Sequence, residues 1–299
     1  MFYEYALEPA VLSSWDRTRF FLDAFGPWKG RFLAEYPRRW KRDVFEGLNC
    51  PDVEKKRITE RLQRLDKRVF SPRANAPYEP SRAWIDNALL EHQRQPFRAI
   101  VASLESAEPH VLDASQVDDT CELWRVESGQ FVSREPAAFL QAVGLLLDAS
   151  SRVVVIDPYF RADQDDKTQP LVAFCRHVQG RAVIEVHFSE DPRSYEICMR
   201  DAARALPRLL PAGMKVTLHC WKEREGGPRL HNRYILTEIG GVKFGDSIEL
   251  GGTGHEDHLS ILDKPSWEKL WDQYAGPTPT FDPAGPSLEF VGGFRRGRA

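Results

Sequence analysis

The sequence predicts an α/β protein in which a mostly parallel sheet is sandwiched by helices and is preceded by a mainly helical region. Three observations support this prediction. From Phe131 onward, segments whose apolar residues recur at helical spacing alternate with short apolar runs. The run at 153–156 is apolar at every position, as expected of a strand buried on both faces of a sheet. Before Phe131, prolines and serines open a series of segments that read as helices.

Length and composition indicate a globular protein with a sizeable core. The chain has 299 residues, enough for one large domain or two ordinary ones. Hydrophobic residues make up 42% and charged residues 28%, as in soluble proteins. No apolar run reaches the length of a membrane span, and the first residues lack the basic-then-apolar pattern of a signal peptide. We therefore expect a cytoplasmic location and no transmembrane segment.

Cysteine usage and net charge further limit the classes of protein that the sequence fits. The five cysteines are scattered without a Cys-x-x-Cys pair, so reduced buried thiols fit better than disulfides or a zinc site. The net charge of −3 does not point to nucleic acid, although a whole-chain sum can hide a local patch. We expect no metal ion and no other cofactor.

Residues 1–130 are expected to form the mainly helical N-terminal domain. Serine or proline residues open predicted helices that end near Gly26, Tyr36, Leu48, Val69 and His92. The clearest of them follows Pro51, with apolar residues at steps of four, three and four. Short strands are expected only at 97–104 and 110–112.

The stretch 29–73 is locally basic, with Trp28, Tyr36 and Trp40 in or beside it. One interpretation is a surface for a phosphate backbone or for a larger protein complex. The other is the solvated face of several helices, because the acidic residues of this stretch lie at pairing distances from the basic ones. The sequence leaves both open.

Residues 131–293 are expected to form the second domain, followed by a basic tail at 294–299. Strands are predicted at 152–157, 182–188 and 215–221, with helices between them. A hairpin, a final helix at 266–274 and a closing strand at 287–291 complete the pattern.

The hairpin contains the most informative residues. Gly240-Gly241 forms the turn between a strand at 230–237 and a shorter returning strand. Side chains alternate along a strand, so His231 and Arg233 face the same way. Arginine offers charge and a fork of donors to phosphate oxygens, and histidine can act as a nucleophile or proton carrier. The pair therefore predicts an anion site.

The pattern His231-x-Arg233-x4-Glu238-x6-Gly245-Asp246 resembles the phospholipase D superfamily motif, His-x-Lys-x4-Asp-x6-Gly-Ser/Gly. The spacing is the same, but Arg replaces Lys, Glu replaces Asp, and Asp follows the glycine. The His-x-Arg form is also similar to the phospholipase-D-like C-terminal domain of MIT-domain proteins, which is thought to bind rather than cut. The resemblance covers roughly 131–293.

This resemblance implies a phospholipase-D-like fold and metal-independent phosphodiester chemistry. His231 would attack phosphorus and form a phosphohistidine, Arg233 would grip the phosphate and Glu238 would support the site. A second histidine protonates the leaving oxygen in the superfamily, yet the only other partial match, His92-Gln93-Arg94, has Ala99 where the acid belongs. Single-motif nucleases of the superfamily are homodimers, so the resemblance implies a homodimer that cuts nucleic acid. Such proteins resemble bacterial defence or mobile-element effectors.

Further substrate-binding candidates flank the hairpin and the central strand. Asp157 and Tyr159 follow that strand, where ligands bind in open α/β sheets, and the superfamily often carries a similar Asp-Pro-Tyr. Gly245, Asp246 and His255 follow the hairpin. Asp246 either enters the pocket, where it would repel a phosphodiester, or faces water. The segment 254–258 lacks metal-ligand spacing.

Two classes of function therefore compete. The first is a metal-independent phosphodiesterase, most simply a nuclease. The second is a catalytically silent binding module or scaffold subunit for a phosphate-bearing ligand, nucleic acid, lipid or protein partner. The three positions that differ from the motif favour the binding module. The matching spacing favours a functional site under both classes of function.

Overall fold

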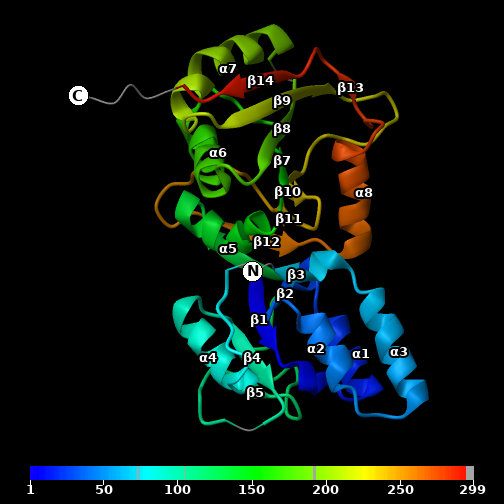
Figure 1. Cartoon of the computed structure of the whole chain (residues 1–299). Coiled ribbons are helices and arrows are strands. Elements are labelled where there is room, and N and C mark those ends of the chain that lie inside the picture. Colours follow the sequence, from blue (N-terminus) through cyan, green and yellow to red (C-terminus); the bar gives the residue numbers. More distant parts are fainter. Residues whose placement is uncertain (72, 74, 105, 191–192, 294–299) are drawn as a thin grey trace. The chain divides into compact units, whose positions relative to one another are not determined.

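The chain forms two compact units. The computed structural model describes residues 1–293 except 72, 74, 105 and 191–192, so the expected basic tail at 294–299 lies outside the described residues. One unit comprises Phe2–Glu127, and the other comprises Ser128–Ala299 together with Met1. Figure 1 shows the elements of both.

The N-terminal unit is built on a five-stranded sheet with the order β3-β2-β1-β4-β5, in which neighbouring strands run parallel. Its strands are Tyr3–Leu7 (β1), Arg31–Ala34 (β2), Phe70–Ser71 (β3), Ala99–Ala102 (β4) and Val111–Asp113 (β5). Its helices are Trp15–Ala24 (α1), Trp40–Gly47 (α2), Asp52–Gln63 (α3) and Trp84–Arg94 (α4), with 3-10 turns at Pro9–Leu12, Pro27–Lys29 and Lys67–Val69.

The described helices of this unit contain more residues than its strands, but the parallel sheet at its centre was not predicted. The helix expected to end at Tyr36 is replaced by a 3-10 turn and by β2, and β1 was not foreseen. Both strands are four or five residues long and almost wholly buried, so they show no alternation of polar and apolar side chains. A short continuous apolar run does not distinguish a buried strand from a buried helix.

Helices cover both faces of this sheet. One hydrophobic cluster joins the sheet to α1, α2 and α3 around the fully buried Trp40 and Trp124. A second cluster joins the opposite face to α4 through Ala88 and Phe97. Adjacent β1 residues alternate between the clusters, with Tyr5 in the first and Ala6 in the second.

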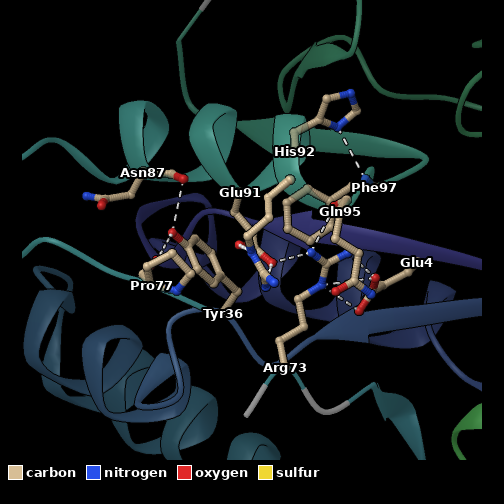
Figure 2. Close-up of polar contacts among 10 residues, drawn as sticks. Glu4, Tyr36, Arg73, Pro77, Asn87, Glu91, His92, Gln95 and Phe97 are labelled. Carbon is tan, nitrogen blue, oxygen red and sulfur yellow. Dashed lines mark hydrogen bonds and ion pairs between the residues drawn. The ribbon is translucent and has the colours of Figure 1, made fainter. Parts of the chain in front are cut away.

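A buried ion cluster ties α4 to β1 (Figure 2). The guanidinium of Arg73 donates to both carboxylate oxygens of Glu4, to Oε1 of Glu91 at 2.7 Å and to the carbonyl of Gln95 at 2.9 Å. It also lies over the ring of Phe97, with Cζ 3.8 Å from the ring centroid. Arg73, at the end of the basic stretch, is thus a core residue.

The C-terminal unit is built on a nine-stranded mixed sheet with the order β13-β9-β8-β7-β10-β11-β12-β6, and β14 also pairs with β9. Its strands are Gly129–Ser133 (β6), Arg152–Ile156 (β7), Val183–Ser189 (β8), Lys215–Lys222 (β9), Arg233–Thr237 (β10), Gly241–Phe244 (β11), Glu256–Ile261 (β12), Asp282–Pro283 (β13) and Leu288–Val291 (β14). The central strands β7, β8 and β9 run parallel, and antiparallel strands flank them on both sides.

Helices again lie on both faces of the sheet, so the predicted α/β class is confirmed. They are Pro136–Asp148 (α5), Asp165–Val178 (α6), Tyr195–Leu209 (α7) and Lys264–Ala275 (α8). Figure 1 shows α6 and α7 on one side of the sheet and α8 on the other. Trp267 of α8 packs in a cluster with Val154, Ile156 and Leu236 of the sheet.

The predicted hairpin is confirmed as β10 and β11, and its register positions the candidate site. Arg233 pairs with Phe244, and Leu236 pairs with Gly241. On its other side β10 runs antiparallel to β7, with Tyr234 opposite Ile156. The start of β10 therefore lies at the edge of the sheet where β7 ends, beside the segment that follows Ile156.

Candidate functional site

His231 and Arg233 are gathered around one aromatic ring, that of Tyr159. The Cζ atom of Arg233 lies 4.8 Å from the ring centroid of Tyr159, within the range of a cation–π contact. The Tyr159 hydroxyl lies 3.4 Å from Nδ1 of His231, and the two rings meet edge to face at 6.5 Å. His231 is exposed and precedes β10, while Arg233 is half-buried. The structure thus brings together three of the predicted site residues.

Asp157, two residues before Tyr159, is a buried carboxylate. Its Oδ1 accepts the backbone N–H of Tyr159 at 3.0 Å, which fixes the start of the loop that carries the ring. Its Oδ2 and Nε of Arg233 are both buried without a hydrogen-bond partner among the described residues. Burial raises the pKa of Asp157, and the cations Lys167 and Arg233 act in the opposite direction. Asp157 is therefore placed to position the site.

A cleft of about 590 Å³ opens beside His231. It lies where β7, β8 and β9 end, which is the edge of a parallel sheet at which ligands bind. Both charge signs occur in its wall, with Lys222 3.4 Å from Glu190. The lining residues are Pro158, Tyr159, Ser189, Glu190, Lys222, Glu223, Arg229, Leu230 and His231, of which one is a histidine.

Asp246 is partly neutralised by an arginine rather than directed at His231. Its Oδ2 lies 3.3 Å from the Arg134 guanidinium, and its side chain is 75% exposed. Arg134 also contacts Glu249 at 2.7 Å, and Lys167 forms an ion pair with the same carboxylate. The reading in which Asp246 faces water at the end of the hairpin is the one that this geometry favours.

Gly245 and His255 have local structural roles. A side chain at position 245 would meet Oδ1 of Asp257 at 2.9 Å and the carbonyl of His258 at 3.0 Å, so close packing of β11 on β12 accounts for the glycine. The exposed His255 accepts the backbone N–H of Gly252 at 3.2 Å through Nδ1, within its own loop. In the part of the chain that the structure describes, no contact joins either residue to His231.

Glu238 lies at the opposite end of β10 from His231. It follows the last residue of β10, whereas His231 precedes the first. Its carboxylate accepts the backbone N–H and hydroxyl of Ser151, at 2.5 and 2.8 Å, and the backbone N–H of Arg152 at 3.1 Å. An acid at this motif position therefore clamps β10 to the start of β7.

A polar cluster on the α8 side of the sheet was not predicted. Three side chains each offer one atom that could bind a metal ion, and these atoms lie within 4.8 Å of one another. They belong to Glu185 and His187 of β8 and to His219 of β9. Arg152 binds both oxygens of Glu185, at 2.7 and 2.9 Å. The alternation of strand 182–188 could have shown that Glu185 and His187 share a face, but no pattern in the sequence pointed to His219.

Hydrogen bonding decides what this cluster can hold. The indole N–H of Trp221 donates to Nδ1 of His187 at 3.1 Å, so a neutral His187 carries its proton on Nε2. Burial lowers the pKa of His187 to about 4, so the ring is neutral at pH 7. Its Nε2, which faces Glu185 at 3.6 Å, then has no lone pair for a metal ion. These residues do not fit a metal centre.

Several arginines of the basic stretch 29–73 form ion pairs. Arg39 and Arg42 pair with acids one helical turn away, at 3.0 and 2.7 Å. Arg61 and Arg68 pair with Asp23 and Asp66. Together with the buried Arg73, these contacts favour the interpretation of 29–73 as paired helix surface rather than as an anion-binding face.

All five cysteines are free, and Cys175, Cys198 and Cys220 are buried. None of the helices in the described ranges is long and apolar enough to cross a membrane.

Comparisons with known proteins find similarity at a low level only. No protein-family model matches the chain, and no curated protein matches it significantly. Among solved structures, Nuc from Salmonella typhimurium, a phospholipase D family member, is similar over 52% of this chain and 97% of its own, with 13% identity and a TM-score of 0.34. TrmBL2, an archaeal chromatin protein, is similar over 53% of this chain and 57% of its own, with 11% identity and a TM-score of 0.25. Similarities this low carry no conclusion about activity.

Proposed function

We propose that the protein is a metal-independent phosphodiesterase in which His231 attacks phosphorus, with nucleic acid as its substrate class. The observation that carries the proposal is the grouping of an exposed imidazole and a guanidinium around Tyr159, of which the imidazole and the tyrosine line a cleft. A nucleophile and a phosphate-binding cation at adjacent positions are what phosphoryl transfer through a histidine requires.

The contacts of His231 suit it to act through Nε2. A proton on Nδ1 would point to the Tyr159 hydroxyl oxygen and leave the Nε2 lone pair free to attack. The bond from Nε2 to phosphorus forms as the bond to the leaving oxygen breaks, and Arg233 offsets the charge on the phosphate oxygens. Water then attacks the phosphohistidine, which releases the phosphate monoester and restores the imidazole.

The leaving oxygen needs a proton, and we assign its donor to a second subunit. Among the described residues that line the cleft, one is a histidine. A two-fold axis that brings the His231 residues of two chains together would supply the acid that one chain lacks. A homodimer is therefore part of the proposal.

A binding module is the second candidate, and the same single histidine favours it. If the chain acts as a monomer, the group around Tyr159 binds a phosphate through Arg233 without turnover. Arginine in place of lysine retains charge and donors, so phosphate binding survives the change.

Cleavage assays separate these functions. Single-stranded DNA, RNA and bis(4-nitrophenyl) phosphate are incubated with the full chain in EDTA. We expect cleavage, its loss in His231→Ala, and its retention in His110→Ala, which removes an exposed histidine of the other unit. Cleavage that persists in His231→Ala would overturn the assignment. An inert protein that binds phosphate only while Arg233 is present would establish the binding module instead.

A further inference from the structure

Ser287 and His219 form a hydrogen-bonded pair at the point where β14 joins the sheet. Oγ of Ser287 lies 2.8 Å from Nδ1 of His219. Leu288 pairs with Leu218 in antiparallel register, so the two residues lie opposite each other on neighbouring strands. Ser287 is exposed, and neither residue lines the cleft beside His231. A hydroxyl on an imidazole nitrogen, open to solvent, is the start of a nucleophile site.

The other nitrogen of His219 faces a carboxylate. Its Nε2 lies 3.5 Å from Oε2 of Glu185. Burial acts to raise the pKa of Glu185, but contacts with both imidazoles and with Arg152 outweigh it and hold that pKa well below its ordinary value. An ionised carboxylate favours the tautomer with the proton on Nε2. Nδ1 is then an acceptor for the Ser287 hydroxyl.

The segment that carries Ser287 is held on both sides. Before it, the hydroxyl of Tyr195 donates to the carbonyl of Pro286 at 2.8 Å, and the backbone N–H of Ala284 donates to the carbonyl of Cys220 at 2.9 Å. After it, β14 pairs with β9. The ring of His219 stacks on Trp221, with an interplanar angle of 8°. Serine and base are therefore fixed before any substrate arrives.

We propose that Ser287, His219 and Glu185 form a second catalytic site, separate from His231, that cleaves carboxylic esters. Oγ of Ser287 attacks the carbonyl carbon as its proton passes to Nδ1 of His219, and Glu185 stabilises the imidazolium. The alcohol leaves with the electron pair of its bond and takes that proton. Water then attacks the acyl-serine by the same route, which releases the acid and restores the serine.

Covalent labelling of the full chain with a fluorophosphonate probe tests this site. A bond from Oγ to phosphorus forms as fluoride leaves, and peptide mass spectrometry locates the label. We expect it on Ser287, with its rate lowered about 100-fold or more in His219→Ala, the usual effect of losing a general base. In His219→Ala, the rate of 4-nitrophenyl acetate hydrolysis should fall to the rate measured for Ser287→Ala. The second variant changes an exposed residue.

The chain contains its own matched control. Oγ of Ser260 lies 3.4 Å from Nδ1 of His258, a looser pair of the same residue types, and should remain unlabelled. His231→Ala should label like the wild type, so failure of the phosphodiesterase proposal leaves this one intact. No label on Ser287, equal labelling in a folded His219→Ala, or labelling without ester turnover would each overturn the proposal. Circular dichroism establishes that the His219 variant is folded.

Discussion

Removal of the Glu238 carboxylate should weaken the fold of the C-terminal unit and leave the His231 site intact. The carboxylate accepts two hydrogen bonds from Ser151 and one from Arg152, at 2.5–3.1 Å. A hydrogen bond to a charged group contributes about 1.5–3 kcal/mol when buried, but Ser151 is exposed and its freed donors can be hydrated. We therefore expect Glu238→Ala to cost about 2 kcal/mol of unfolding free energy, and Glu238→Gln, which keeps one acceptor oxygen, about 1 kcal/mol.

Differential scanning calorimetry of the full chain measures this loss. A unit of this size changes its Tm by about 2–4 °C per kcal/mol, so Glu238→Ala should lower the transition of the C-terminal unit by about 4–8 °C. The control is Glu268→Ala, which removes an exposed glutamate that lies 3.9 Å from Lys264 and should cost less than about 0.5 kcal/mol. Binding of bis(4-nitrophenyl) phosphate should be the same in all these variants.

The opposite result would refute this reasoning. If Glu238→Gln melts with the wild type but no longer binds the probe, the carboxylate acts at the phosphate site and not as a clamp between β10 and β7. If Glu238→Gln loses both stability and probe binding while Glu268→Ala loses neither, the hydrogen bonds of Glu238 also position His231.

Three further perturbations have defined outcomes. Arg73→Met leaves Glu4 buried without its cation and removes one of the two guanidinium partners of Glu91, so it should cost roughly 3–5 kcal/mol in urea unfolding; an unchanged midpoint would contradict this. Burial acts to raise the pKa of Glu91, but hydrogen bonds from Arg94 and Arg73 outweigh it, so the pKa is lowered. The stability that Glu91 contributes is present above its unfolded pKa of about 4.3 and is lost as pH falls through the lower folded pKa. When the urea midpoint is plotted against pH, Glu91→Gln should therefore show a smaller decrease on the acid side than the wild type. Tyr159→Phe keeps the ring under Arg233 and should retain phosphate binding better than Tyr159→Ala in calorimetric titration, whereas equal losses would place the effect in the hydroxyl.

The hairpin was predictable because several independent signals coincide there. A glycine pair marks the turn, β-forming residues flank it, and the two-residue period puts His231 and Arg233 on one side. The structure adds Tyr159 as the residue that contacts both. The position of Tyr159 depends on the antiparallel pairing of β10 with β7, which joins segments more than seventy residues apart and leaves no trace in local sequence.

Two strands of the N-terminal sheet, β4 and β5, coincide with predicted strands, whereas β1 and β2 were missed because buried parallel strands are hard to recognise. The residues of β2, Arg31–Ala34, follow a proline and a glycine and contain no polar alternation. Such a segment is identified by what packs on its two faces, here Trp40 on one side and Tyr36 on the other. The ion pairs of Arg73 likewise depend on chain segments that meet only after folding.

The guanidinium of Arg233 and the ring of Tyr159 form one structural feature. A planar guanidinium gains from lying over an aromatic face, whereas a compact ammonium ion on a flexible stem is held there less well. The Tyr159 ring is set by a backbone bond to the buried Asp157, whose second oxygen and Nε of Arg233 are both unpaired within the described residues. The loop after β7 thus orients the cation and, through the Tyr159 hydroxyl, contacts the imidazole. This orientation supports the proposed role of Arg233 as the cation that binds phosphate.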